Sequence, residues 1–80
     1  MTETTKTWKV VYQDVPFAHT QPGALLIEAE TELDARITAA DHLTRKGKAV
    51  YDEELKIKGG RTHIRTIEVY TARPKGKVIG

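Results

Sequence analysis

The chain has 80 residues, which is enough for one small domain with one compact core but not for a second module. It contains neither cysteine nor serine, so disulfides, thiolate metal sites and cysteine or serine nucleophiles are excluded. The formal net charge is only +2, yet residues 1–43 have a balance of −4 and residues 44–80 one of +6. We therefore expect a single domain over residues 1–80, with an acidic first half and a basic second half.

Two strands are predicted in the first third of the chain, after a polar N-terminal tail at residues 1–6. Apolar and polar side chains alternate along residues 8–13 and again along residues 24–30, as in strands with one face on a core. The connection at residues 14–23 contains two prolines and a Pro-Gly turn signal, which exclude a regular element and a tight hairpin. Within it, Phe17 either caps the open end of the core or forms an exposed anchor for a partner.

An amphipathic helix is predicted over residues 32–46. Thr31 is a suitable N-cap, because its hydroxyl can accept a hydrogen bond from the N–H of Asp34, and Gly47 can end the helix in the left-handed conformation. The apolar stripe expected to face the sheet consists of Leu33, Ile37, Ala40 and Leu43, with Ala39 at its edge. Two acid–base pairs have the i,i+4 spacing of helix ion pairs: Glu32–Arg36 and Asp41–Arg45.

A β-hairpin is predicted after the helix, with strands at residues 55–58 and 62–71. The two glycines at residues 59–60 suit a two-residue type I′ turn. Strict alternation beyond that turn would place the apolar residues at the end of the second strand on the wrong face. We therefore expect a β-bulge near Arg65 and Thr66 that restores their facing.

The order of these elements is ββαββ. It predicts an α+β fold in which a four-stranded, mainly antiparallel sheet carries one helix packed on one face. Residues 73–80 form a basic tail, which we interpret as a solvated terminus, as an arm that contacts phosphate, or as a short strand at residues 77–79 that joins a partner's sheet edge.

No catalytic or metal-binding signature is found in the sequence. The three histidines, at positions 19, 42 and 63, lack the spacing of a helical metal site. The acidic run at residues 52–54 is expected to be solvated surface, because paired carboxylates need a cleft to act as acid and base. We therefore predict a protein that is not an enzyme and uses no cofactor or metal.

The expected location is the cytoplasm. The N-terminal residues lack the apolar core of a signal peptide. No apolar run approaches the length needed to cross a bilayer, so no membrane partner is expected.

A protein partner is favoured over nucleic acid, because the net charge is small and no base-stacking aromatic residues are interleaved with the basic ones. The alternative is nucleic-acid binding through the basic hairpin at residues 56–65, whose basic side chains would share one face, together with the C-terminal tail. The residues expected to contact a partner are Phe17, Leu26, Lys56, Lys58, Arg61, Arg65, Lys75 and Lys77. The sequence favours a homo-oligomer and a monomer equally. A homo-oligomer would form through an apolar patch of Leu26 and Val11 with Tyr51 or Tyr70 on the bare sheet face.

Three segments of the chain resemble the short, functionally unassigned proteins encoded by phages of actinobacteria: residues 7–12 (TWKVVY), 27–35 (IEAETELDA) and 67–71 (IEVYT). The resemblance is one of general style over most of the chain and contains no diagnostic motif. It implies a small non-enzymatic accessory protein that binds a host or phage macromolecule. It assigns no site residue.

Overall fold

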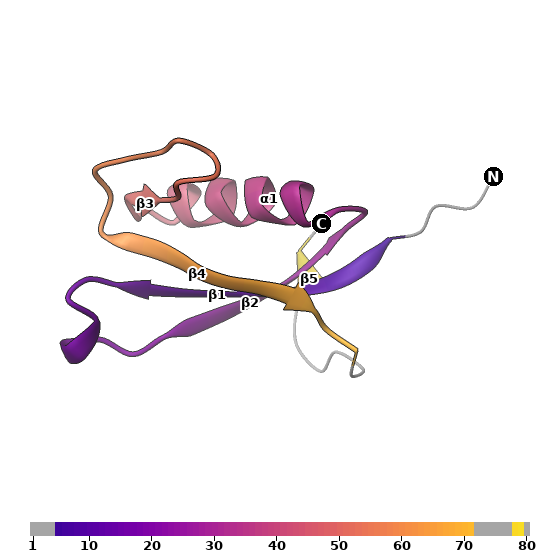
Figure 1. Ribbon diagram of the computed structural model, residues 1–80, viewed down its shortest axis with the longest axis horizontal. Helices are drawn as coiled ribbons and strands as arrows, with labels where there is room; N and C mark the ends of the chain where they lie inside the picture. The colour runs from indigo at the N-terminus through magenta and orange to yellow at the C-terminus, as the bar shows by residue number, and fades with distance from the viewer. Residues whose placement is uncertain (1–4, 72–77, 80) are drawn as a thin grey trace.

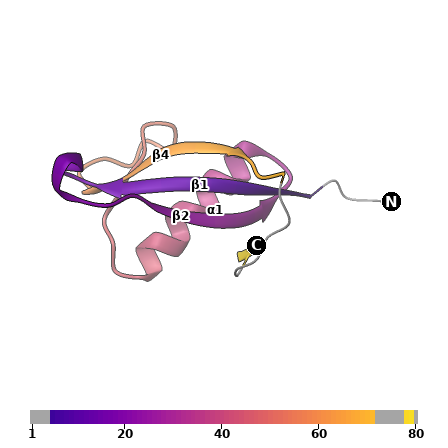
Figure 2. The same ribbon diagram turned by 90° about the horizontal axis from the view of Figure 1, so that it is seen from below.

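The computed structural model describes residues 5–71 and 78–79 (Figure 1). The elements in chain order are β1 (Lys6–Asp14), the 3₁₀ turn η1 (Phe17–His19), β2 (Gly23–Ala29), α1 (Glu32–Arg45), β3 (Val50–Tyr51), β4 (Thr62–Val69) and β5 (Val78–Ile79). The strands form one five-stranded mixed sheet in the order β3-β4-β1-β2-β5, and α1 packs on one of its faces (Figures 1 and 2). The predicted α+β class, with a single helix on a sheet, is confirmed.

β1 is the central strand and pairs antiparallel with both β2 and β4. Trp8 of β1 lies opposite Ile27 of β2, and both are buried in the core beneath α1. The Trp8 indole Nε1–H donates a buried hydrogen bond of 2.9 Å to the Ala29 carbonyl oxygen. The alternation predicted for the first two strands therefore sends their apolar side chains to the helix-covered face. Between these strands the structure has one turn of 3₁₀ helix, where no regular element was expected.

β4 contains the β-bulge in the place that the sequence predicts. Val11 of β1 pairs with Thr66, and its neighbour Tyr12 pairs with Ile64, so Arg65 is the extra residue of β4. The extra residue keeps the apolar side chains on both sides of the bulge on the helix-covered face, where they pack against the core.

The hairpin predicted across Gly59 and Gly60 is wrong, because residues 55–58 form no strand. The chain instead folds back on itself in a turn between Asp52 and Ile57. The backbone N–H and C=O groups of these two residues bond to each other, both at 2.9 Å.

The strand beside β4 is β3, which has only two residues and runs parallel to β4. Gly60 permits this pairing, because a Cβ atom at this position would clash with the carbonyl oxygens of Ala49 and Val50. The second glycine of the pair thus serves a close approach of two backbones.

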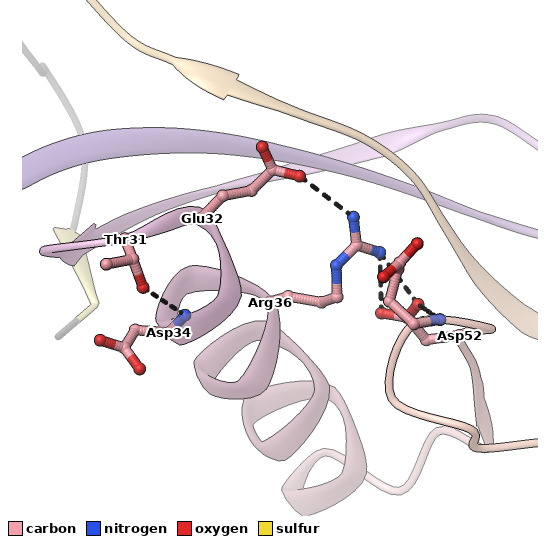
Figure 3. Close-up of polar contacts among 6 residues, drawn as sticks. Thr31, Glu32, Asp34, Arg36 and Asp52 are labelled. Atoms are coloured by element: carbon pink, nitrogen blue, oxygen red, sulfur yellow. Dashed lines mark hydrogen bonds and ion pairs between the residues drawn. The ribbon is translucent and has the colours of Figure 1, made fainter.

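α1 begins and ends within one residue of its predicted bounds. The Thr31 hydroxyl accepts the N–H of Asp34 at 3.1 Å (Figure 3), and Gly47 follows the helix with a φ of +86°. The buried face differs from the predicted stripe and consists of Ala35, Ala39, Ala40 and Leu43. Leu33 and Ile37, which were expected in the core, are 54% and 48% exposed. The stripe is therefore wrong in its N-terminal half.

The C-terminal strand β5 pairs parallel with β2, with Leu26 opposite Val78. The strand considered for a partner's sheet edge is thus paired within the chain itself. The rest of the predicted basic tail, including Lys75 and Lys77, lies outside the described residues, as do residues 1–4 of the predicted N-terminal tail. In the described part of the chain, no helix is long and apolar enough to cross a membrane.

Candidate functional site

Asp52 is the residue that directly follows β3. It is 3% exposed, and its carboxylate accepts hydrogen bonds from Nη1 of Arg36 at 2.9 and 3.0 Å and from the N–H of Glu54 at 3.0 Å (Figure 3). Arg36 also contacts Glu32 at 3.4 Å, as the helix spacing predicts. Because these bonds hold the chain in its turn, β3 stops after Tyr51. The expectation that the acidic run is solvated is wrong for Asp52.

The early end of β3 leaves β4 with an open edge. β3 covers Thr62 and His63 only. From Ile64 to Val69, no other strand of the described residues lies on this side of β4, which is the outermost of the long strands in Figure 2.

The backbone hydrogen-bonding groups on this open edge can be assigned from the ladder on the other side. The N–H of Tyr70 points toward β1 and donates to the Thr7 carbonyl oxygen at 2.8 Å. Backbone groups alternate along a strand, so the N–H groups of Ile67 and Val69 point away from β1, to the open side. Groups of this kind are a template for pairing with a further strand.

One flank of α1 is uncovered above the same edge. Leu33, Arg36 and Ile37 lie within one side of the helix at about 100° per residue, and Arg36 reaches from that side to the turn after β3 (Figure 3). Further along the flank, Ala40 packs with Val50 of β3. The apolar stripe of α1 is therefore covered only as far as β3 extends, and Leu33 and Ile37 lie beyond it.

A groove of about 400 Å³ lies where β3 stops. Residues of the turn, of β4 and of α1 line it, among them Tyr51, Glu53, Glu54, His63, Arg65 and Arg36. It thus continues the line of β3 beside the open edge of β4.

One wall of the groove is a row of aromatic side chains. The His63 ring stacks on Tyr51, with centroids 4.3 Å apart, and meets Phe17 edge-on at 5.4 Å. The Arg65 guanidinium lies 4.1 Å from the centroid of the Phe17 ring and donates to Oε1 of Gln13 at 2.7 Å. Phe17 therefore packs on the side chains of β4 and is not part of either core cluster.

Tyr51 is held to the acidic side of the groove. Its hydroxyl donates to Oε1 of Glu53 at 3.1 Å. This hydrogen bond, and next the charge of the Glu53 carboxylate, raise the pKa of Tyr51 above its ordinary value. The phenol is thus a neutral hydrogen-bond donor at the rim.

The basic residues expected to share one hairpin face are separated in the structure. Lys56 and Lys58 lie on the turn after β3, beside Tyr51 and Glu53. Arg61, which directly precedes β4, instead donates to the carbonyl oxygen of Val15, just after β1, at 3.1 Å. Since residues 55–58 form no strand, the single basic face predicted there does not exist.

Of the remaining predicted contact residues, Leu26 is half-buried on β2, between Lys9 of β1 and Val78 of β5. Leu26 lies near the other edge of the sheet, with β1 between its strand and β4. The structure thus brings together Phe17 and Arg65 and separates both from Leu26.

No local pattern in the sequence indicated the roles of Asp52, Arg36 or the open edge, because these roles depend on contacts between distant segments. The one available signal was the apolar stripe of α1, which is longer than a two-residue strand can cover. Across residues 5–71 and 78–79, no three His, Asp or Glu side chains are grouped to hold a metal ion.

These features define a small α+β domain with an unpaired sheet edge and an adjoining groove. Comparisons with protein families, with curated proteins and with solved structures found no match.

Proposed function

We propose that this is a cytoplasmic, non-enzymatic protein-binding module, of the phage accessory kind that its sequence resembles. It binds its partner by taking an extended segment as an additional strand on β4. The observation that carries this proposal is the open edge of β4 from Ile64 to Val69, which lies beneath an uncovered apolar flank of α1.

Strand addition accounts for both features at once. The outward N–H groups of Ile67 and Val69 would gain main-chain partners, which supply affinity in this mode of recognition. The side chains of an added strand alternate between the two faces. One set would cover Leu33 and Ile37 beneath α1, and the other would lie on the bare face beside Arg65. The partner segment is therefore amphipathic, with apolar residues at every second position.

The groove supplies selectivity at the end of this site. A partner residue placed beyond Tyr51 would meet the aromatic row on one side and the carboxylates of Glu53 and Glu54 on the other. The bulge at Arg65 and the charge of Glu68 also discourage unspecific strand pairing, as is usual for exposed edges.

The test is capture of a partner from an actinobacterial lysate by the wild type and by two matched variants. Val69→Lys places a charge on the open edge, where Val69 is 45% exposed; Ile57→Lys places the same charge on the turn, where Ile57 is 37% exposed. We expect Val69→Lys to lose capture by at least about tenfold and Ile57→Lys to retain it. Equal capture by both variants would contradict strand addition at β4.

A second candidate function is nucleic-acid binding, favoured by the stacking of Arg65 on Phe17 beside the His63–Tyr51 pair. Aromatic rings with a guanidinium are a common platform for unpaired bases. The carboxylates of Glu53 and Glu54 in the same groove weigh against it, because they repel phosphate. Mobility shifts of single-stranded DNA and RNA that weaken with salt, and that Phe17→Ala removes, would support this alternative.

A further inference from the structure

We infer that the strand received by the β4 edge is β4 of a second copy of this chain, paired antiparallel about a two-fold axis at Ile67. The inference rests on the proposed function, since it uses the same edge and names the partner. The result is one continuous sheet across the dimer, with both helices on the same face.

The backbone restricts the symmetric registers that are available. Residues that lie opposite one another in an antiparallel ladder point to the same face of the sheet. The two-fold axis must therefore pass beside a residue that lies opposite its own symmetry mate, and not between two neighbouring residues. A centre at Thr66 or earlier would put the bulge residue Arg65 into the middle of the pairing, so the possible centres on the regular part of the open edge are Ile67, Glu68 and Val69. With a centre at Val69, only the last residues of the two edges would pair, and most of each open edge would stay unpaired.

Charge decides between the two other centres. A centre at Glu68 would place this carboxylate directly against its symmetry mate, and like charges at such a position are destabilising. A centre at Ile67 places Glu68 opposite Thr66 of the other copy. Arg65, which precedes Thr66, carries its positive charge on the same bare face, where it bonds to Gln13 and offsets the charge of Glu68 at longer range.

The helix layer fits the same arrangement. The axis at Ile67 brings the uncovered flanks of the two α1 helices toward each other across the joined strands. Leu33 and Ile37 of α1, and Val69 opposite the core residue Trp8, are the large apolar residues that each copy leaves exposed there. The apolar groups that one copy leaves exposed at this edge are thus those that a second copy can cover.

The oligomeric state tests the pairing. Light scattering from low to high micromolar concentration should show a dimer for the wild type and for Ile57→Lys. For Val69→Lys the dissociation constant should rise at least about tenfold, with an unchanged circular dichroism spectrum as the check on folding. A wild type that stays monomeric, or a Val69→Lys variant that dimerises as the wild type does, would overturn the inference. If the wild type is monomeric and captures a partner from the lysate, and Val69→Lys loses this capture, then self-pairing fails and the proposed function stands.

Disulfide cross-linking tests the register, because the chain has no cysteine of its own. Thr66 and Glu68 of the two copies would form a non-hydrogen-bonded pair, whose side chains are close enough for a disulfide. An oxidised mixture of Thr66→Cys and Glu68→Cys chains should therefore cross-link, and Thr66→Cys alone, which keeps Glu68, should not. A mixture of Thr66→Cys with Glu28→Cys, on the bare face of β2, is the control. Efficient cross-linking of Thr66→Cys with itself, in chains that keep Glu68, would overturn the register centred on Ile67.

Discussion

At the scale of single residues, one buried carboxylate determines where the sheet ends. Desolvation of Asp52 is offset by two hydrogen bonds from Arg36 and one from the N–H of Glu54. Satisfying this charge requires the chain to leave the sheet after Tyr51. The open edge of β4 is thus a consequence of how Asp52 is paired.

Replacing Asp52 with asparagine should destabilise the fold by about 2–3 kcal/mol, because the largely buried charge of Arg36 would then keep only its longer contact with the exposed Glu32. Urea denaturation measures the loss. The matched control is Asp41→Asn. The 3.0 Å ion pair between Asp41 and Arg45 is exposed, so its loss should lower the free energy of unfolding by less than about 0.5 kcal/mol. Similar losses in the two variants would show that the Asp52 pair is not structural.

Tyr51 provides a prediction about pH. Its pKa in the folded protein is raised above 10.0 by the hydrogen bond to Glu53 and the charge of that carboxylate. Because this pKa is higher in the folded protein than in the unfolded chain, the contact of Tyr51 with Glu53 contributes fully to stability below pH 10. The contribution is lost as the pH rises through the pKa of Tyr51 in the folded protein.

In an absorbance titration of phenolate, with Tyr51→Phe subtracted, Glu53→Gln should lower the midpoint of Tyr51. Glu54→Gln should leave that midpoint where it is, because Glu53 is the group that affects Tyr51. An unchanged midpoint in Glu53→Gln would rule out Glu53 as the cause.

At the scale of elements, α1 contacts the sheet through alanines. Trp8, Val10 and Ile27 already fill the space between the layers from the sheet side, so the helix contributes the small side chains of Ala35 and Ala39 there. The larger residues Leu33 and Ile37 are left on the flank. Close packing between layers therefore decided which side of the amphipathic helix is buried.

The two halves of the apolar stripe should respond differently to truncation. Leu43→Ala, in the buried half, should cost about 2–4 kcal/mol. Ile37→Ala, in the exposed half, should cost less than about 1 kcal/mol when unfolding is measured at low protein concentration. Equal losses would mean that Ile37 is packed in the core after all.

At the scale of the whole molecule, the sheet is closed unequally at its two sides. β5 covers part of β2 on one side, and β3 covers two residues of β4 on the other. Strands of the basic second half thus flank those of the acidic first half on both sides. Within the described residues, the strands of the two halves are therefore interleaved and not divided between two ends of the sheet.

If two copies share the β4 edge, folding is linked to association. The thermal unfolding midpoint of the wild type should then rise with protein concentration, because only folded chains can form the dimer. Calorimetry over a wide concentration range measures this shift, and Val69→Lys should not show it. A midpoint independent of concentration in both proteins would contradict the linkage.

The sequence by itself determined the features that depend on contiguous residues. The first two strands, the bounds of α1 and the bulge at Arg65 follow from side-chain period and from cap chemistry within a few positions of each residue. Phe17 and Arg65 were both predicted to contact a partner, which stays a prediction, and the sequence could not place them against each other as the structure does.

Only the tertiary structure decided what lies beside β4. A Gly-Gly pair is equally suited to a hairpin turn and to a close approach of two backbones, and the local pattern around Gly60 does not distinguish them. The burial of Asp52 likewise depends on Arg36, sixteen positions away and on another element. The open edge, the groove and the exposed half of the helix stripe all follow from these long-range contacts, because charge pairing and close packing act between surfaces that meet only in the folded chain.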